Sequence, residues 1–382
     1  MSALIKDERD IEELRRLFPV TENWTYLYNG GVHPCPKPVG DAMRDFITRW
    51  ETDGRPGCST GFEAFTGLRE EFGSLIHSES RNIVITESTT AGINMASQII
   101  KPRCDQNVVV TDLEFMSDTY PWIVCHPAQV RFARNQNGKI SPSDIAELID
   151  ELTAAVSVSA VAAGSGFRFD LPAIHEAISQ QNIPLIVDAA QALGVIDINV
   201  NEFKPSFLVC TASKWLMGPA GVGFLYVSDQ YLDSKPPDVG WFAAANRNDW
   251  NLEVCDLYSD ARRFQGGIPN LAGIVGALAG IKLIKQIGRE FIESRVLSLT
   301  AYAIEGLEKI GVDIWTPHSP AERAGIVFFR TPGFKDLYEK LKAEHIYCGS
   351  FLSGIRIDPN FYNTYEEIDR FLGVVRNHVA KL

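Results

Sequence analysis

The chain has 382 residues, more than a single hydrophobic core usually supports, so we expect two domains. Hydrophobic residues make up 45% and charged residues 22%, as in an ordinary globular enzyme. The 36 Lys and Arg against 48 Asp and Glu give a formal charge of −12, which argues against a general nucleic-acid binder.

The seven cysteines are dispersed and form no CxxC pair, a pattern typical of reduced thiols in a cytoplasmic protein rather than of a disulfide framework. The histidines are equally scattered, so we expect no metal site. The first stretch, MSALIKDERDIEELRRLF, is charged and amphipathic and lacks the apolar core of a signal peptide. Apolar residues nowhere run together for the roughly 18 positions of a membrane span, so no membrane partner is expected.

Short apolar runs alternate with amphipathic stretches from about residue 60 to residue 230. The runs that predict strands are residues 83–86, 108–112, 130–133, 156–162, 185–188, 207–210 and 223–227. Helix-like segments lie between several of them, at residues 91–100, 142–152 and 172–181. The alternation predicts an α/β fold with a mainly parallel sheet covered by helices on both faces. Ligands bind outside the carboxyl ends of such strands, so the residues that follow each run are the candidates for chemistry.

After about residue 265 the pattern changes to a long helical stretch, residues 272–285 and 289–310, and then a shorter α+β pattern. We interpret residues 40–262 as a large domain. Residues 1–39 and 263–382 then form a smaller α+β domain.

Two of the strand ends carry small or aromatic side chains. Thr89 and Thr90 follow the first strand at the start of a helix, where free N–H groups and the helix dipole favour a phosphate. An ordinary helix N-cap would use the same residue types. Phe115 follows the second strand and could stack on a flat ring, although a core aromatic would look the same.

Two further strand ends carry charge. Asp188 ends a buried strand, where a carboxylate is costly unless it pairs with a cation such as a protonated ring nitrogen; an N-cap is the alternative. Gln191 lies one turn further. Lys214 follows the next strand among apolar neighbours, where an amine loses its charge easily and becomes nucleophilic. A surface loop lysine is the commoner case, but the parallel sheet would direct Lys214 and Asp188 to one crevice.

The segments IVDAAQALG and TASKWLMGPAGVGFLYV, in this order, resemble the class V aminotransferase superfamily of fold-type I pyridoxal-phosphate (PLP) enzymes. The resemblance extends over nearly the whole chain, through YLYNGGVHPCPKPV, STTAGIN, GFRFDL, FQGGIPN and GIRIDPNFYNT. It implies an enzyme that binds PLP and acts on an amino acid. The FQGGIPN loop resembles one that reaches the neighbouring subunit's phosphate site, which implies a homodimer.

The resemblance also implies a role for each matching position. Lys214 would hold the cofactor as a Schiff base and act as the catalytic lysine, Asp188 would pair with the ring nitrogen, and Gln191 would contact the ring phenolate. Phe115 falls at the stacking position, and Arg356 matches the arginine that binds the substrate carboxylate. The positions expected around the phosphate are Thr89, Thr90, Thr211, Ser213 and, across the dimer, Gly267 and Ile268.

Several positions depart from the pattern. Desulfurases of this superfamily usually stack a His where Phe115 stands, and they carry a reactive cysteine on a long loop before the arginine. Cys348 lies too close to Arg356 for such a loop, so we expect no persulfide on the enzyme. Ala160 and Ala162 replace polar residues near the ring, Ile268 replaces a Thr, and Ser213 stands where His is common.

We therefore expect most of all an aminotransferase, in which Lys214 moves a proton between the substrate and the cofactor. A PLP-dependent lyase or epimerase shares the first proton removal and is the alternative. A non-catalytic protein of the same fold is less well supported, because it would not need Lys214, Asp188, Gln191 and Arg356 together. The glycine-rich stretch 218–223 leads into a strand and not a helix, so it is not a dinucleotide fingerprint.

Overall fold

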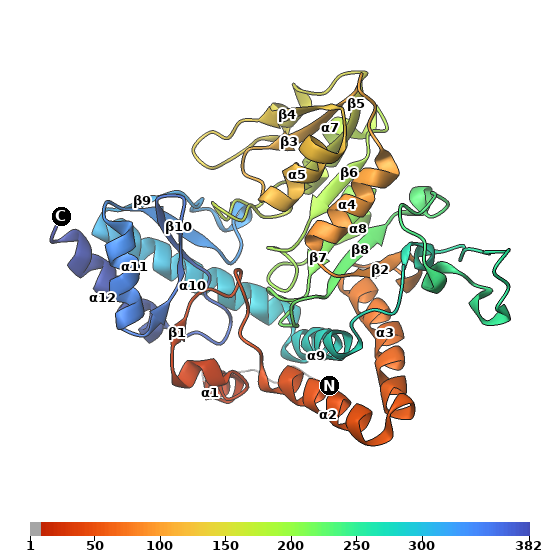
Figure 1. Ribbon diagram of the computed structural model, residues 1–382. Helices are drawn as coiled ribbons and strands as arrows, with labels where there is room; N and C mark the ends of the chain where they lie inside the picture. The colour runs from red at the N-terminus through yellow and green to blue at the C-terminus, as the bar shows by residue number, and fades with distance from the viewer. Residues whose placement is uncertain (1–8) are drawn as a thin grey trace.

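The structure, a computed structural model, describes residues 9–382, so the start of the amphipathic N-terminal stretch lies outside the described residues. A seven-stranded sheet forms its centre (Figure 1). The strands are β2 (Ile83–Thr86), β3 (Asn107–Thr111), β4 (Gln129–Ala133), β5 (Thr153–Ser159), β6 (Leu185–Asp188), β7 (Phe207–Thr211) and β8 (Gly223–Val227). Their order is β2-β8-β7-β6-β5-β3-β4. The pairs from β7 to β4 are parallel, and β8 is antiparallel to both β7 and β2. The predicted mainly parallel seven-stranded sheet is confirmed.

The sheet separates two hydrophobic cores because alternate strand residues face opposite sides. Ile83 and Ile85 belong to the core on one side, and Val84 belongs to the core on the other. The first core includes side chains of α3 (Arg55–Leu75), α7 (Leu171–Ser179), α8 (Val200–Phe203) and α9 (Leu271–Ile287). The second includes side chains of α4 (Thr89–Ile100) and α5 (Met116–Cys125). Helices thus cover both faces, as the apolar runs predicted.

Two predicted elements differ from the structure by more than two residues at an end. Strand β5 ends at Ser159 and not at residue 162, because the chain turns back: the N–H of Ala162 donates to the carbonyl of Phe167 over 2.8 Å, and Gly166 takes a φ of +74°. The helix predicted over 142–152 is only α6 (Pro142–Ala146). Asp150 instead forms a turn, in which its Oδ1 accepts from the N–H of Leu152 over 2.9 Å.

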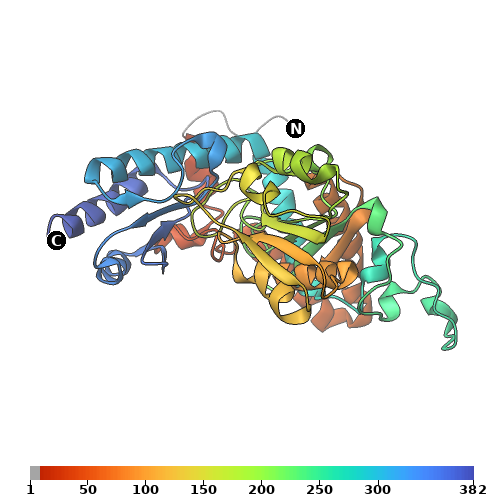
Figure 2. The ribbon, with the colours of Figure 1, turned by 90° about the horizontal axis from the view of Figure 1, so that it is seen from above.

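The C-terminal part contains a four-stranded sheet with its own hydrophobic core. Its strands, in the order β12-β13-β10-β9, are β12 (Gly349–Phe351), β13 (Gly354–Ile357), β10 (Val327–Arg330) and β9 (Asp313–Ile314). The helices of this part are α10 (Arg289–Ile310), α11 (Phe334–Ala343) and α12 (Tyr365–Val379). Figure 2 shows it beside the central sheet, and in Figure 1 helix α10 extends from this part toward α9.

Two elements bear on the division into domains. Near the N-terminus, β1 (Thr25–Tyr26) pairs in parallel with β11 (Ile346–Tyr347) of the C-terminal part. Helix α9, which we assigned to the smaller domain, packs against α2 (Lys37–Asp53) and α3. The domain limits 40–262, 1–39 and 263–382 stay a prediction.

No single helix between residues 9 and 382 is both long and apolar enough to cross a membrane. Helices α9 and α10 have the length and composition of a membrane span only when they are taken together, and a bend of 82° separates them.

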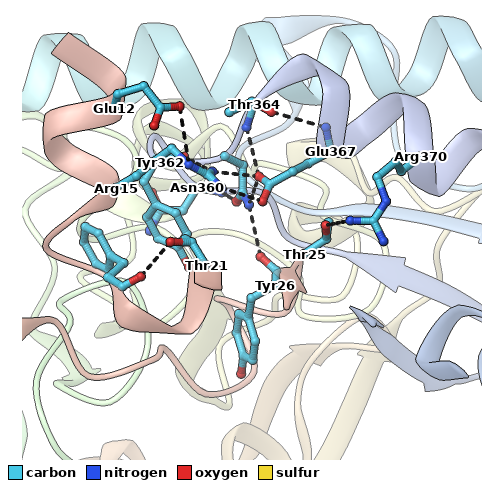
Figure 3. Close-up of polar contacts among 12 residues, drawn as sticks. Glu12, Arg15, Thr21, Thr25, Tyr26, Asn360, Tyr362, Thr364, Glu367 and Arg370 are labelled. Carbon is cyan, nitrogen blue, oxygen red and sulfur yellow. Dashed lines mark hydrogen bonds and ion pairs between the residues drawn. The ribbon is translucent and has the colours of Figure 1, made fainter. Parts of the chain in front are cut away.

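The N-terminal segment is tied to the C-terminal helix by polar contacts (Figure 3). Arg15, at the end of α1 (Arg9–Arg15), donates to both carboxylate oxygens of Glu367 over 3.1 Å each. Arg370 donates to the hydroxyl of Thr25 over 3.2 Å. The second bond holds β1 against α12. The residues that follow β1 lie beside the end of β13, since Tyr28 forms a parallel bridge with Asp358 and the N–H of Gly30 donates to the Asp358 carboxylate.

Candidate active site

The expected site residues other than Gly267 and Ile268 gather at the end of the central sheet where the parallel strands have their carboxyl ends. Strands β2, β3, β6 and β7 point the same way, so their carboxyl ends meet at this edge. Asp188 is the last residue of β6 and Thr211 the last of β7. Helix α4 begins shortly after β2, and Phe115 follows β3 as the N-cap of α5.

Lys214 lies in the loop after β7, partly exposed, with its Nζ 5.6 Å from the ring centroid of Phe115. Burial lowers the pKa of its amine; the nearby Asp188 raises this pKa and Arg356 lowers it further. A lowered pKa leaves more of the amine neutral near pH 7, which makes it a better nucleophile and base. The structure therefore brings together Lys214, Asp188, Phe115 and Arg356.

Asp188 is a buried carboxylate, 7% exposed, whose Oδ1 accepts the backbone N–H of Ala190 over 2.7 Å. Burial raises its pKa, while Lys214 and this hydrogen bond lower it. A buried carboxylate of this kind gains from a cationic partner.

Gln191 is held on both ends of its amide. Its Oε1 accepts from the indole Nε1 of Trp215 over 2.9 Å, and its Nε2 donates to the carbonyl of Gly30 over 2.9 Å. Arg356 approaches the same Oε1, with its Nη2 at 3.4 Å. The amide therefore joins the loops after β6 and β7 to the N-terminal segment and to β13.

Arg356 is 4% exposed and paired with Asp358, which is fully buried; its Nε lies 2.6 Å from Oδ1 of the carboxylate. The sequence interpretation included Arg356 and missed Asp358. The sequence did contain a signal for Asp358, because it lies two residues after Arg356 and residues two apart on an extended strand point to the same face.

Hydroxyl groups surround the start of α4. The buried Oγ1 of Thr89 has no hydrogen-bond partner within residues 9–382, whereas Thr90 bonds the hydroxyl of Ser117 over 2.8 Å. Ser88 caps the helix by accepting from the N–H of Ala91. The hydroxyls of Thr211 and Ser213, after β7, lie 3.2 Å apart. A helix start of this kind with an unpaired buried hydroxyl suits an anion such as phosphate.

Two further carboxyl groups lie at this edge, and the sequence interpretation missed both. Glu114 accepts from the hydroxyls of Thr111, over 2.6 Å, and Ser159, and burial raises its pKa to about 7. Both carboxyl oxygens of Asp118 are buried without a partner among the described residues. Burial, together with the neighbouring Asp188 and Glu114, raises the pKa of Asp118 well above its usual range. Burial therefore favours the protonated form of both carboxyl groups.

The positions that depart from the superfamily pattern lie in different parts of the structure. Ala160 and Ala162 are buried in the core that contains α7, and it is Ser159 that contacts Glu114 at the sheet edge. Gly267 and Ile268 are exposed on the loop before α9. Ile268 lines an apolar cavity of about 520 Å³ with Phe46 of α2. Within one chain, no described polar contact joins this loop to Lys214.

The residues that the structure brings together fit PLP. Lys214 offers an amine of lowered pKa, Asp188 a buried carboxylate for a ring nitrogen, and Phe115 a ring beside the amine. Hydroxyls for a phosphate are those of Thr89, Thr90, Thr211 and Ser213. The unpaired buried oxygen of Thr89 is the observation that most directly favours a phosphate.

Comparisons with known proteins agree with this fit. The sequence model of the family described as aminotransferase class-V matches residues 25–371. A probable cysteine desulfurase of Pyrococcus abyssi is 26% identical over 403 residues, which cover 97% of this chain and 98% of that protein. The apo structure of cysteine desulfurase from Thermococcus onnurineus NA1 is 26% identical with a TM-score of 0.88, over 100% of both chains.

A cystine C–S lyase, C-DES, has the same fold. Its complex with cysteine persulfide has a TM-score of 0.87 at 20% identity, over 94% of this chain and 99% of its own. A mutant of C-DES with glycine covalently linked to the PLP cofactor has a TM-score of 0.88 at 20% identity, over 95% and 99%. The family match, which spans most of the chain, confirms the predicted superfamily, fold class and cofactor. The chain thus belongs to the aminotransferase class-V family of PLP-dependent enzymes.

Proposed function

We propose that this protein is a PLP-dependent lyase that cleaves the C–S bond of cysteine or a cysteine-derived amino acid by elimination. The relatives that cover nearly the whole chain are named cysteine desulfurases, and one structural neighbour is a cystine C–S lyase. Our first expectation, an aminotransferase, is supported only by the name of the family, and the comparisons favour the lyase alternative.

In this proposal each residue at the carboxyl ends of the strands has a separate role. PLP, when bound, supplies the electron sink for breaking bonds at the substrate α-carbon. Lys214 removes the α-proton as general base, because its lowered pKa leaves it neutral enough to accept one. Asp188 keeps the ring nitrogen protonated, Phe115 covers the ring, and Arg356 orients the substrate through its carboxylate.

The sulfur leaves on a small molecule in this proposal. Cys348 is only 2% exposed, in the core of the C-terminal part, and burial raises the pKa of its thiol strongly. Cys210, close to Asp188 and Lys214, is also fully buried, and burial raises its pKa in the same way. A protonated, buried thiol is a poor acceptor of sulfur, because the thiolate is the nucleophile. The buried state of Cys348 is the observation that carries the choice of elimination.

The products of L-cysteine and L-cystine test the proposal. Elimination from cysteine, with one water, yields pyruvate, ammonia and hydrogen sulfide; elimination from cystine, also with one water, yields pyruvate, ammonia and cysteine persulfide. We expect equal amounts of pyruvate and ammonia from the protein supplied with PLP. Alanine with sulfur bound to the protein would indicate a desulfurase, and a keto acid without C–S cleavage would indicate an aminotransferase.

The exposed Cys35 provides a control for an enzyme thiol. It lies close in sequence to His33, whose N–H donates to the carbonyl of Ser213 over 3.0 Å, so it is near the loop of Lys214. Cys35→Ala should still release sulfide at the wild-type rate. Loss of sulfide release in this variant would show that the sulfur passes through Cys35.

We also infer a homodimer. The support is the exposed loop of Gly267 and Ile268, together with Trp250 and Leu252, which are 88% and 95% exposed on a neighbouring segment. Large apolar side chains exposed in this way are typical of an interface. Light scattering of the purified protein would give the mass of one or two chains.

All seven cysteines are free, and a cytoplasmic location remains an expectation based on them.

A further inference from the structure

The carboxylate of Asp358 occupies one side of the Arg356 guanidinium. Beyond the 2.6 Å contact with Nε, its second oxygen, Oδ2, accepts the backbone N–H of Gly30 over 3.1 Å. Gly30 leaves the room for this arrangement, since a Cβ there would lie 2.3 Å from Nη2 of Arg356 and 3.0 Å from Oδ2 of Asp358. The ion pair is thus enclosed by the N-terminal segment that Figure 3 shows tied to α12.

Few hydrogen-bond donors of Arg356 remain for a substrate. A guanidinium has five N–H groups, of which Nε donates to Asp358, Nη1 to the carbonyl of Ala163 over 2.8 Å, and Nη2 to Gln191 over 3.4 Å. Each terminal nitrogen keeps one N–H. These two N–H groups could donate to one substrate carboxylate, but the positive charge of the guanidinium is already compensated by Asp358.

The ion pair belongs to the pocket of the candidate amine. Arg356 lowers the pKa of Lys214. Burial raises the pKa of Asp358, and this rise is opposed by Arg356, by the N–H of Gly30 and by Lys214. The described contacts of Arg356 with Gln191, and of Gln191 with Trp215, connect the ion pair to the loop of Lys214.

We propose that Asp358 makes the carboxylate pocket electrically neutral, so that this protein selects only weakly for an α-carboxylate and binds a simple amine within about 100-fold of the matching amino acid. The inference deepens the proposed function and depends on it for the binding of amines at the Lys214 cofactor site. An unpaired buried guanidinium would need the substrate carboxylate as its counter-ion. With Asp358 present, that carboxylate instead enters beside a negative charge.

The experiment compares L-alanine with ethylamine, which is alanine without its carboxylate. Each is titrated into the PLP-loaded protein, and the dissociation constant is read from the cofactor absorption band at one pH. Two hydrogen bonds without net charge predict that the wild-type protein binds alanine less than about 100-fold more tightly than ethylamine. Asp358→Asn and Asp358→Ser should increase this preference by about tenfold or more, because each leaves Arg356 with a net charge.

Asp150→Asn serves as the matched control. Asp150 forms an ion pair with Arg131, 2.7 Å long, at the far edge of the sheet, so this variant should keep the wild-type preference. If Asp358 had a purely structural role, its replacement would weaken the binding of alanine and of ethylamine by the same factor. The ratio of the two dissociation constants would then be unchanged. An unchanged ratio in both Asp358 variants, with the cofactor band intact, would overturn the inference.

The result does not depend on C–S cleavage, since neither ligand contains sulfur. A protein that binds alanine and ethylamine as described but releases no sulfide would overturn the proposed function and leave the inference on Asp358 standing. A wild-type preference for alanine above about 100-fold would overturn the inference alone.

Discussion

The indole of Trp215 donates to the amide oxygen of Gln191 over 2.9 Å. Trp215 directly follows Lys214, and Gln191 lies one turn after Asp188, so this bond fixes the distance between the loops that carry the amine and the carboxylate. Trp215 is itself 1% exposed, and Gly325 of the C-terminal part lies so close that a Cβ there would be 2.5 Å from the indole. The relative position of Lys214 and Asp188 is therefore set by both parts of the protein.

Replacing Lys214 with Ala should abolish turnover and the visible absorption band of the cofactor, because no other described amine faces Phe115 at this edge. The spectrum and the rate of pyruvate formation are the measurements. Lys204→Ala, at an exposed position, is the control and should behave as wild type. Normal activity of the Lys214 variant would disprove the role of this lysine.

Replacing Asp188 with Asn should weaken cofactor binding by at least about tenfold, since a neutral amide cannot pair with a protonated ring nitrogen. The Asn oxygen can still accept from Ala190, so the fold should persist. Cofactor binding is measured by equilibrium dialysis. Asp197→Asn changes an exposed carboxylate paired with Arg289 and should have no effect. Equal binding in the Asp188 variant would place the ring nitrogen elsewhere.

Replacing Arg356 with Leu should weaken the binding of L-alanine by more than about tenfold, because it removes the donors and leaves Asp358 as an unpaired anion. Ethylamine, which has no carboxylate, should bind with much less change. The half-exposed Arg330 provides the control variant Arg330→Leu. Unchanged alanine binding would show that the carboxylate is held by another group.

Replacing Glu114 with Gln should change how stability depends on pH. Burial raises the pKa of Glu114 from 4.5 to about 7, so the native protein holds a proton that the unfolded chain loses above pH 4.5. The stabilisation from this proton is complete below pH 4.5 and is lost as the pH rises through about 7. It amounts to about 3 kcal/mol, from 1.36 kcal/mol per pKa unit.

Urea unfolding of the cofactor-free protein between pH 4.5 and 7.5 measures this effect. The wild type should lose stability relative to the Gln variant as the pH rises. Glu151→Gln, at an exposed position, should follow the wild type. Parallel curves for wild type and Glu114→Gln would mean that Glu114 is ionised throughout this range.

Replacing Cys348 with Ala should leave C–S cleavage within about twofold of wild type and lower the free energy of unfolding by about 1 kcal/mol, as for a small loss of core volume. The physical reason is that this thiol is buried and part of the core of the C-terminal part. Pyruvate formation and urea unfolding are measured on the same preparation. A variant that folds but releases no sulfide would assign Cys348 to the chemistry.

The sequence by itself determined where the strands lie and which residues follow them. Apolar runs mark all seven strands of the central sheet to within a few residues, because every strand except the partly exposed edge strand β4 is buried along most of its length. From that pattern alone Asp188 and Lys214 fall at one edge of the sheet. Strand β5 was predicted three residues too far along the chain and helix α6 too long, since turns built by Gly166 and Asp150 leave no trace in the hydrophobic pattern.

Only the tertiary structure decided the electrostatics of the site. Asp358 is adjacent to Arg356 in any extended strand, but its burial and its bond to Gly30 depend on a segment from the other end of the chain. The raised pKa values of Glu114 and Asp118 likewise arise from burial beside Asp188, which lies on another strand. Charge states depend on desolvation and on neighbours distant in sequence, and neither is contained in the local order of residues.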